Sequence, residues 1–382
     1  MKVIFVSNAS WNLYNFREGF MKALKRAGHR VYFCAPFDGC SDKLKEKGYD
    51  FIRISLERKG TNFFNDLTLM VRLFSIYRKI KPDIVFHYTI KPNIYGSIAA
   101  KFSGTKCVNT VTGLGYIFIQ KNIYIFPVRI LYWLACTFAE KTIFHNKEDL
   151  KVFLDKGLID IKKSCVVNGS GVNTEFFAPG TSNPAYPGNG FKFLFIGRLL
   201  RDKGIFELIE AIRLVKKEFS SASLLLLGKS DDSNPAAVSG IKIKEWSETG
   251  LIKYFEETQD VRPFIKECDC VVLPSYREGL PRTLLEALSM EKPIIATAVP
   301  GCREIIKDGI NGFSIPAKNP FALAEAMKKM IMSTEEKRKE MGRAGRQQVV
   351  KDFNEKEVIE SYQQIFLAAM QRKSEHLSLK AR

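Results

Sequence analysis

Two glutamates eight residues apart, Glu278 and Glu286, are the most informative feature of this chain. They bracket residues 279–285, and the apolar run 270–274 precedes them. That run predicts a buried parallel strand ending in a Pro-Ser turn. Pro281 lies where a helix would begin, so Glu278 falls in a strand-to-helix loop and Glu286 falls on the helix itself.

A loop of this kind can bind a ligand through its backbone. The amides of Gly279 and Leu280 would lie near the first turn of the helix, where N–H groups are unpaired and the helix dipole is positive. These groups suit an anionic or hydroxyl-rich ligand, and Glu286 can accept hydrogen bonds from a diol. The spacing alone is equally compatible with a surface helix that carries two solvated acids.

A second set of charged residues lies about 80 residues earlier, in the loop Gly197-Arg198-Leu199-Leu200-Arg201-Asp202-Lys203-Gly204. Arg198 and Lys203 lie at opposite ends of this loop, between a predicted strand and a predicted helix. Arginine grips phosphate as a bidentate fork and lysine binds it as a point charge, so the pair could hold a diphosphate. The loop lacks the order of a Walker A motif.

Strands and helices alternate along the chain, which predicts two doubly wound parallel sheets. The pattern restarts after a bridge rich in Pro, Gly and Asn at residues 179–190. Ligands of such sheets bind beyond the carboxyl ends of the strands. The predicted strands are 3–7, 31–35, 83–87, 107–111, 191–196, 224–227, 252–255, 270–273 and 293–296, and the predicted helices are 16–27, 93–102, 205–218, 320–332, 334–352 and 355–371.

Composition restricts the class of protein. A chain of 382 residues is long for one core, so we expect two domains. No signal peptide is evident, since Met1 and Lys2 run directly into an apolar strand. The eight cysteines form no CxxC pair, which indicates neither zinc nor a disulfide framework and is consistent with a reducing cytoplasm.

Positive charge is concentrated in the first half of the chain. Residues 1–170 hold 27 Lys and Arg against 13 Asp and Glu, whereas residues 171–382 hold 32 against 28. No acid occurs between Asp83 and Glu140. A basic half could face nucleic acid, an anionic lipid surface or a phosphorylated substrate. The aromatic segments 62–81 and 123–135 carry scattered cations and suit a membrane interface, although such apolar stripes are also typical of helices that face a core.

The chain resembles a known protein family. The motifs Gly197-Arg198…Lys203-Gly204, Glu278-Gly279-Leu280-Pro281…Glu286-Ala287 and Pro300-Gly301…Glu304…Gly309-x-Asn311-Gly312 resemble those of family 4 of the retaining glycosyltransferases. The resemblance implies the GT-B fold, in which two Rossmann-like domains face each other across a cleft. It divides the chain into an acceptor and membrane-facing domain at residues 1–184, a nucleotide-sugar domain at 185–355 and a C-terminal helix at 356–382 that packs back on the first domain.

The resemblance also implies roles for individual residues. Arg198 and Lys203 would bind the donor diphosphate, Glu286 the ribose, and Glu278 the donor sugar. Arg198, Lys203 and Glu278 would thereby be the catalytic residues. The full set of expected donor-binding residues is Gly197, Arg198, Lys203, Gly228, Val261, Glu278, Gly279, Leu280, Pro281, Thr283 and Glu286, with the nucleobase near Gly228 and Val261.

The first half is similar to bacterial enzymes that extend sugars on undecaprenyl diphosphate. This narrower likeness lies in Tyr14-x-Phe16-Arg17, Lys91-Pro92-Asn93-x-Tyr95-Gly96 and Thr112-Gly113-Leu114-Gly115. We expect Asn15, Lys91, Thr112 and Gly113 on the acceptor side. The sequence departs from the family at two points: residues 8–15 lack the usual Gly-Gly pair, and Thr112-Gly113 stands where many members have a histidine. His87 is the one histidine at a predicted strand end, and a structural role is the simpler interpretation of it.

The acid-free stretch offers no general base for the transfer. Retaining transfer can proceed without one if the departing diphosphate oxygen takes the proton of the acceptor hydroxyl. The protein then positions the substrates and stabilises the leaving group, whereas a glycosidase needs a pair of carboxylates. No D-x-D motif occurs, so we expect no metal and no other cofactor.

The sequence therefore predicts a retaining glycosyltransferase on the cytoplasmic face of the membrane. The expected partners are a UDP-sugar, a polyprenyl-diphosphate-linked glycan and an anionic membrane surface. Two alternatives remain. A UDP-sugar epimerase on the same fold would need acid and base side chains around the sugar. A nucleic-acid-binding protein is suggested only by the pI of about 9.4 and has no recognisable binding motif.

Overall fold

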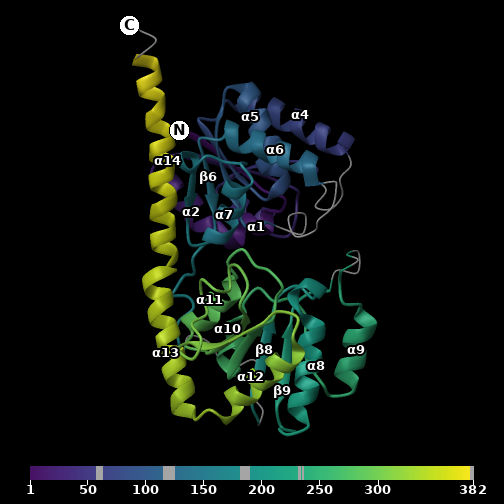
Figure 1. Ribbon diagram of the computed structural model, residues 1–382. Coiled ribbons are helices and arrows are strands. Elements are labelled where there is room, and N and C mark those ends of the chain that lie inside the picture. The colour runs from purple at the N-terminus through teal and green to yellow at the C-terminus, as the bar shows by residue number, and fades with distance from the viewer. Residues whose placement is uncertain (57–62, 115–124, 181–189, 231–233, 235, 379–382) are drawn as a thin grey trace. The chain divides into compact units, whose positions relative to one another are not determined.

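The computed structural model describes residues 1–56, 63–114, 125–180, 190–230, 234 and 236–378 (Figure 1). The chain forms two compact units, the first comprising Met1–Ser170 and Lys356–Arg382 and the second Gly171–Glu355. The predicted division after residue 184 falls within 181–189, outside the described residues. The structure divides the chain earlier because Val172 and Phe177 are already buried in the core of the second unit.

Within the described residues, the first unit contains a seven-stranded parallel sheet in the order β3-β2-β1-β4-β5-β6-β7. Its strands are β1 (Lys2–Val6), β2 (Arg30–Ala35), β3 (Asp50–Arg53), β4 (Ile84–Tyr88), β5 (Lys106–Val111), β6 (Lys141–Phe144) and β7 (Ser164–Val166). Its helices are α1 (Ser10–Phe16), α2 (Glu18–Arg26), α3 (Ser41–Glu46), α4 (Phe63–Ile80), α5 (Ser97–Ser103), α6 (Ile125–Phe138), α7 (Lys147–Asp155) and α14 (Glu355–Ser378).

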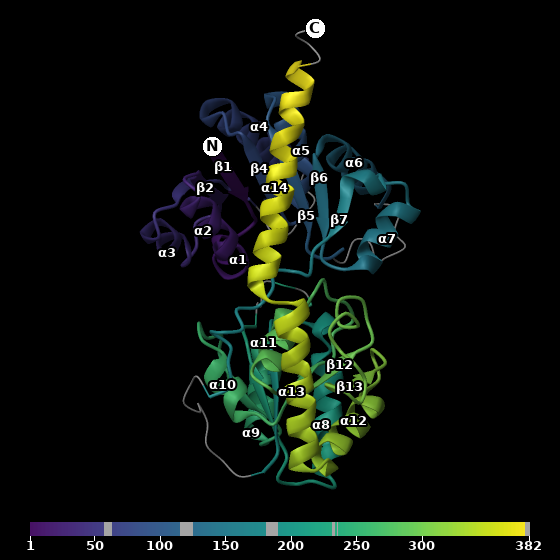
Figure 2. The same ribbon diagram turned by 90° about the vertical axis from the view of Figure 1, so that its left-hand side faces the viewer.

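The strands β1, β2, β4, β5 and β6 bury both faces, as expected for a parallel sheet that helices cover on two sides, whereas the edge strands β3 and β7 are only partly buried. On β1, Val3 and Phe5 pack with side chains of α2 and α14, whereas Ile4 and Val6 pack with α4 and α5. Figure 2 shows α14 lying across its face of the first sheet. The final helix therefore completes the core of the first unit.

The second unit contains a six-stranded parallel sheet, again within the described residues, in the order β10-β9-β8-β11-β12-β13. The prediction of two doubly wound parallel sheets is confirmed. The strands are β8 (Lys192–Ile196), β9 (Ser223–Leu227), β10 (Lys253–Phe255), β11 (Cys270–Leu273), β12 (Ile294–Thr297) and β13 (Gly312–Ile315). The helices are α8 (Ile205–Lys216), α9 (Gly240–Glu248), α10 (Arg262–Glu267), α11 (Arg282–Ser289), α12 (Pro320–Met332) and α13 (Glu335–Asp352).

A buried arginine joins α14 to the rest of the first unit. Arg17 donates from Nη1 to the Tyr362 hydroxyl at 3.2 Å and from Nη2 to His145 Nε2 at 3.3 Å. Its guanidinium also lies 4.5 Å from the centre of the Tyr88 ring. Because arginine only donates, His145 Nε2 must accept. Burial and the nearby guanidinium hold the pKa of His145 well below its ordinary value.

His87 belongs to a second buried network and is structural, as the simpler interpretation held. Its Nδ1 donates to Asn109 Oδ1 and its Nε2 accepts from the Tyr77 hydroxyl, both at 2.9 Å. The tautomer follows from Asn109, whose Nδ2 donates to the Ala135 carbonyl and whose oxygen can only accept. Burial lowers the pKa of His87 from 6.5 to about 4.

This burial predicts a loss of stability in mild acid. Above pH 6.5 His87 is neutral in both the folded and the unfolded chain. As the pH falls from 6.5 towards 4, only the unfolded chain takes up the proton, so the free energy of unfolding decreases by about 3 kcal/mol. Urea unfolding measured across this range checks the expectation.

The matched variant is His87→Gln. It should be less stable at pH 7, yet its stability should depend less on pH between 6.5 and 4, with His145 retaining part of the dependence. Equal pH slopes for the two proteins would contradict a neutral, buried His87.

Candidate functional site

The strand order of the second sheet fixes where a ligand can bind. The chain runs outward from β8 to β9 and β10, and then returns to place β11 on the other side of β8. The loops that follow β8 and β11 therefore diverge at the carboxyl ends of two neighbouring strands. A crevice at such a reversal of strand order is the usual ligand site of an open parallel sheet.

Lys203 and Glu278 meet at this reversal. Lys203 Nζ lies 2.5 Å from Glu278 Oε1, and both side chains are largely buried. The backbone holds the two loops together, since the Tyr276 N–H donates to the Asp202 carbonyl at 2.8 Å. The structure thus brings together two residues that the sequence separates by 75 positions. In this arrangement the charge of Lys203 is already balanced by a carboxylate.

Arg198 provides a cation that is not balanced in this way. It lies in the same loop after β8, its side chain is exposed, and it has no side-chain partner in the part of the chain that the structure describes. A guanidinium at the carboxyl end of β8 can bind a phosphate without first breaking an ion pair.

Glu286 lies one turn into α11 and is buried, with 9% of its surface exposed. Burial raises the pKa of its carboxyl group, and Arg282, whose Nε lies 3.0 Å from Oε1, opposes that shift. Pro281 immediately precedes the helix, as predicted. Gly279 and Leu280 lie in the preceding loop, and Thr283 lies in the first turn of the helix.

Close backbone approaches explain two glycines at the site. A Cβ on Gly228 would lie 1.8 Å from the Gly197 carbonyl oxygen, so the turns after β8 and β9 could not come together. A Cβ on Gly301 would lie 2.6 Å from the Gly279 oxygen, in the loop that carries Glu278. The Glu278 N–H donates to the Pro300 carbonyl at 3.3 Å, so the turn after β12 supports this loop.

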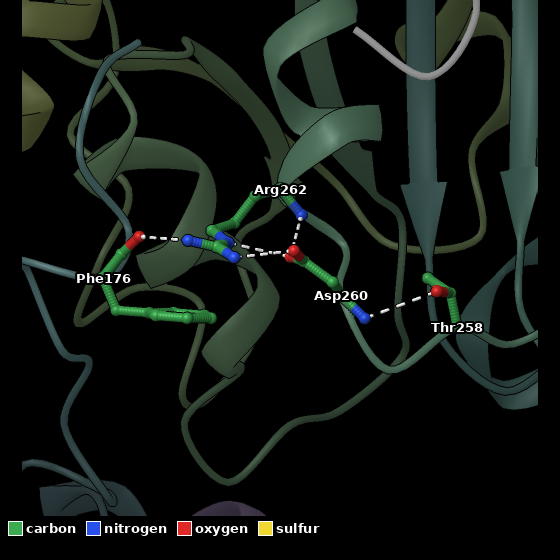
Figure 3. A network of polar contacts seen from close by, with 4 residues as sticks. All are labelled: Phe176, Thr258, Asp260 and Arg262. Atoms are coloured by element: carbon green, nitrogen blue, oxygen red, sulfur yellow. Dashed lines mark hydrogen bonds and ion pairs between the residues drawn. The ribbon is translucent and has the colours of Figure 1, made fainter. Parts of the chain in front are cut away.

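Val261 lies beside a network that fixes its loop (Figure 3). Arg262 grips the Asp260 carboxylate from Nε at 2.8 Å and from Nη2 at 2.7 Å. The same guanidinium lies 3.6 Å from the centre of the Phe176 ring and donates to the Phe176 carbonyl at 3.4 Å. The Asp260 N–H donates to Thr258 Oγ1 at 3.3 Å. The Asp260-x-Arg262 spacing is the one signal of this network in the sequence, and it is too common to predict the contact with Phe176.

The first sheet reverses in the same way, with β4 returning beside β1. A pocket of about 230 Å³ lies there, and Lys91, Thr112 and Gly113 line it, together with Asn8, Leu56, Thr89, Ile90, Asn93, Val111 and Tyr132. Three of the four predicted acceptor-side residues therefore line the same pocket. Asn15 is not among the lining residues, and its Nδ2 donates to the Trp11 carbonyl at 2.9 Å.

A carboxylate does lie close to the stretch between Asp83 and Glu140, which itself contains no acid. Asp66 of α4 lies 2.6 Å from Lys91 Nζ and also accepts from the Tyr95 hydroxyl at 3.0 Å. This carboxylate is not predicted from the sequence because α4 precedes the stretch. Asp66 is engaged by both partners and does not line the pocket. Among the described residues, no group of three or more His, Cys, Asp or Glu could hold a metal ion.

Comparisons with known proteins agree with this arrangement. The model described as "Glycosyl transferase 4-like" matches residues 2–146, and that described as "Glycosyl transferases group 1" matches residues 182–348. A Campylobacter jejuni N,N'-diacetylbacillosaminyl-diphospho-undecaprenol alpha-1,3-N-acetylgalactosaminyltransferase is 29% identical over 350 residues, covering 87% of this chain and 89% of the relative.

Two further proteins are similar over much of the chain. An Escherichia coli UDP-Gal:alpha-D-GlcNAc-diphosphoundecaprenol alpha-1,3-galactosyltransferase is 26% identical, covering 67% of this chain and 68% of the relative. The crystal structure of a glycosyltransferase from Rickettsia africae superimposes with a TM-score of 0.79 at 22% identity, covering 97% of this chain and 98% of the other. That likeness shows the fold.

The exposed guanidinium predicts a specific loss of nucleotide affinity. Arg198→Ala should raise the Kd for UDP about 10- to 100-fold, because a charge-assisted hydrogen bond contributes about 1.5–3 kcal/mol. Isothermal titration calorimetry with UDP measures the effect. The matched control is Arg201→Ala, which removes an exposed arginine of the same loop that lies over the Phe206 ring. Similar UDP affinity in the Arg198→Ala variant and the wild type would contradict the assignment.

Proposed function

This chain belongs to the group 1 glycosyltransferases of the GT-B fold, and we propose that it moves a hexose or N-acetylhexosamine from a UDP-sugar to a polyprenyl-diphosphate-linked saccharide, with retention. The observation that supports donor binding is Arg198, an exposed cation with no side-chain partner among the described residues, in the same loop as Lys203 of the Lys203–Glu278 pair. Both relatives described above act, by name, on diphosphoundecaprenol-linked sugars. Since they are transferases by name, we do not carry forward the epimerase or the nucleic-acid-binding protein.

In the proposed reaction the protein binds and orients the substrates but does not act as the base. Arg198 contacts the diphosphate and stabilises the charge that develops on it as the sugar departs. Glu286 accepts from the ribose hydroxyls, and Glu278 accepts from hydroxyls of the donor sugar. The departing phosphate oxygen takes the proton of the acceptor hydroxyl on the same face of the sugar. The first-unit pocket holds the acceptor saccharide. The guanidinium and the amides at the start of α11 balance the diphosphate charge, so the proposal includes no metal ion.

The Lys203–Glu278 pair predicts opposite effects on binding and transfer. Glu278→Gln removes a negative charge beside the diphosphate site and leaves the Lys203 ammonium for the phosphates, so UDP should bind several-fold more tightly. The sugar loses its hydrogen bond to a carboxylate, so kcat for transfer should fall by about 10- to 100-fold. Calorimetry with UDP and a transfer assay with a panel of UDP-sugars and a crude lipid acceptor measure the two effects.

The control is Glu257→Gln, which disrupts an exposed pair with Lys229 at 3.8 Å in the same unit. It should change neither quantity. If Glu278→Gln transfers sugar at the wild-type rate, Glu278 does not hold the donor sugar. If no UDP-sugar supports transfer by the wild type to any polyprenyl-diphosphate acceptor, the proposed function is wrong.

We also propose that the first unit binds the cytoplasmic face of the membrane as a peripheral protein. Helices α4, α5 and α6 lie next to one another in one layer (Figure 1). They expose large apolar side chains, namely Phe64, Leu67, Val71, Phe102, Ile130 and Trp133. Exposed cations accompany them, namely Arg72, Arg78, Lys79 and Lys101. Apolar side chains combined with cations match the interface of an anionic membrane. No helix in the described residues is long and apolar enough to cross a bilayer.

Vesicle flotation tests this surface. Wild-type protein should float with vesicles containing phosphatidylglycerol and bind less to phosphatidylcholine vesicles or in high salt. Phe64→Ser and Trp133→Ser should each weaken binding several-fold, because each removes exposed apolar area from the layer. Phe321→Ser removes an aromatic of the second unit whose exposure, 68%, lies between those of Phe64 (77%) and Trp133 (48%), and it serves as the control. Equal flotation of all three variants and the wild type would exclude the α4–α6 surface.

A further inference from the structure

Tyr276 joins the two loops that carry Lys203 and Glu278. It lies in the loop after β11, two residues before Glu278. Its backbone N–H donates to the carbonyl of Asp202, the neighbour of Lys203, at 2.8 Å. Its hydroxyl donates to Glu207 Oε1 at 2.6 Å, and Glu207 lies in the first turn of α8. One residue thus bridges the loop after β11 to both the loop and the helix that follow β8.

The backbone contacts between these two loops leave room for a rotation. A Cβ on Gly204 would lie 2.2 Å from the Pro274 carbonyl oxygen, so the loops approach closely there. This approach and the Tyr276 amide are two points of contact, and a segment held at two points can still turn about the line that joins them. The hydroxyl bond to Glu207 adds a third point, which is set off from the backbone by the length of the tyrosine ring. It therefore restricts the rotation.

The ring of Tyr276 is held in place independently of its hydroxyl. Lys318 Nζ, from the turn after β13, lies 4.9 Å from the ring centre, where an ammonium is attracted to the face of the ring. Burial and the neighbouring Glu207 raise the pKa of the Tyr276 hydroxyl, so it stays protonated at neutral pH and donates to the carboxylate. A phenylalanine here would keep the contact with Lys318 and lose only the hydrogen bond.

We propose that Tyr276 is a positioning residue for the transfer, which sets the place of Glu278 relative to Lys203 through its bond to Glu207. The Lys203–Glu278 contact of 2.5 Å would be broken by a small rotation of the loop. The bond from the Glu278 N–H to Pro300 ties the loop to the turn after β12 and does not fix its distance from Lys203. A misplacement of about 1 Å can cost about 100-fold in rate. The inference rests on the proposed function, in which Glu278 accepts from the donor sugar.

Tyr276→Phe tests the hydroxyl alone. With a UDP-sugar that supports transfer and a crude lipid acceptor, kcat should fall about tenfold, whereas the Kd for UDP from calorimetry should stay within about twofold. Glu207→Ala should lower kcat to a similar extent, and the double variant should fall no further, because both changes remove the same bond. Glu207→Gln should keep most of the kcat, since an amide oxygen can also accept from the hydroxyl.

A second measurement needs neither donor nor acceptor. Lys203 is largely buried against Glu278, so an amine-reactive ester should label it slowly. Tyr276→Phe should raise the labelling of Lys203 several-fold, as measured by peptide mass spectrometry on the folded full chain. Lys192, which is paired with Glu267 in the same unit, is the internal reference, and its labelling should not change.

The matched control is Tyr49→Phe. It removes a hydrogen bond of the same kind from the first unit, where the Tyr49 hydroxyl donates to Glu18 Oε1 at 3.2 Å. This variant should lose stability to heat as Tyr276→Phe does, but it should change neither kcat nor the labelling of Lys203. A structural role alone would make the two variants behave alike.

The outcomes separate this inference from the proposed function. Unchanged labelling of Lys203 in Tyr276→Phe would contradict the inference, whatever the transfer rate, and so would an unchanged kcat. A fall in kcat with Tyr276→Phe but not with Glu207→Ala would show that the hydroxyl acts on the substrate directly and not through Glu207. If the labelling rises but the wild type transfers sugar to no lipid acceptor, Tyr276 does position the pair and the proposed function is wrong.

Discussion

The reversal of strand order in each sheet is the constraint on which the rest of this molecule depends. Crossovers between parallel strands are right-handed, so a chain that adds strands on one side and then on the other must separate two loops at the carboxyl edge. In the first unit the separated loops follow β1 and β4, and in the second unit they follow β8 and β11. Arg198, Lys203 and Glu278 lie in the loops that follow β8 and β11, where such a reversal leaves backbone and side chains open to a ligand.

Charge is distributed differently at the two reversals. In the second unit Lys203 and Glu278 neutralise each other, and Arg198 is exposed with no side-chain partner among the described residues. In the first unit Lys91 is neutralised by Asp66, and the pocket is lined largely by uncharged groups. The net positive charge of the first half is therefore spread over its surface rather than concentrated in its pocket. That distribution is consistent with attraction to an anionic surface combined with selection of a neutral sugar.

The sequence predicts well those strands and loops that leave a local residue pattern, and it predicts poorly those that do not. Long apolar strands and the Glu278–Glu286 loop were visible, since burial on both faces and helix-start signals leave a local pattern. The strands β3, β6, β7 and β13 were not predicted, because each has only three or four residues and leaves little apolar pattern in the sequence. Contacts such as Lys91 with Asp66 depend on packing between distant segments. Nor does a local pattern disclose that Asn93 lies in a π-helical turn, with a side-chain oxygen that has no partner among the described residues.

Unpaired buried atoms point to the same two places independently of any motif. Ser7 follows β1 and Tyr88 ends β4, and the hydroxyl oxygen of each is buried without a partner in the described part of the chain. Asp202 and Ser275, which follow β8 and β11, likewise each have one such oxygen. Cores normally pair their polar groups, because an unpaired group loses its bonds to water without replacement. In the described residues, several of these unpaired atoms therefore lie at the two reversals, although others lie elsewhere, such as Thr142 Oγ1 on β6 and Ser247 Oγ on α9.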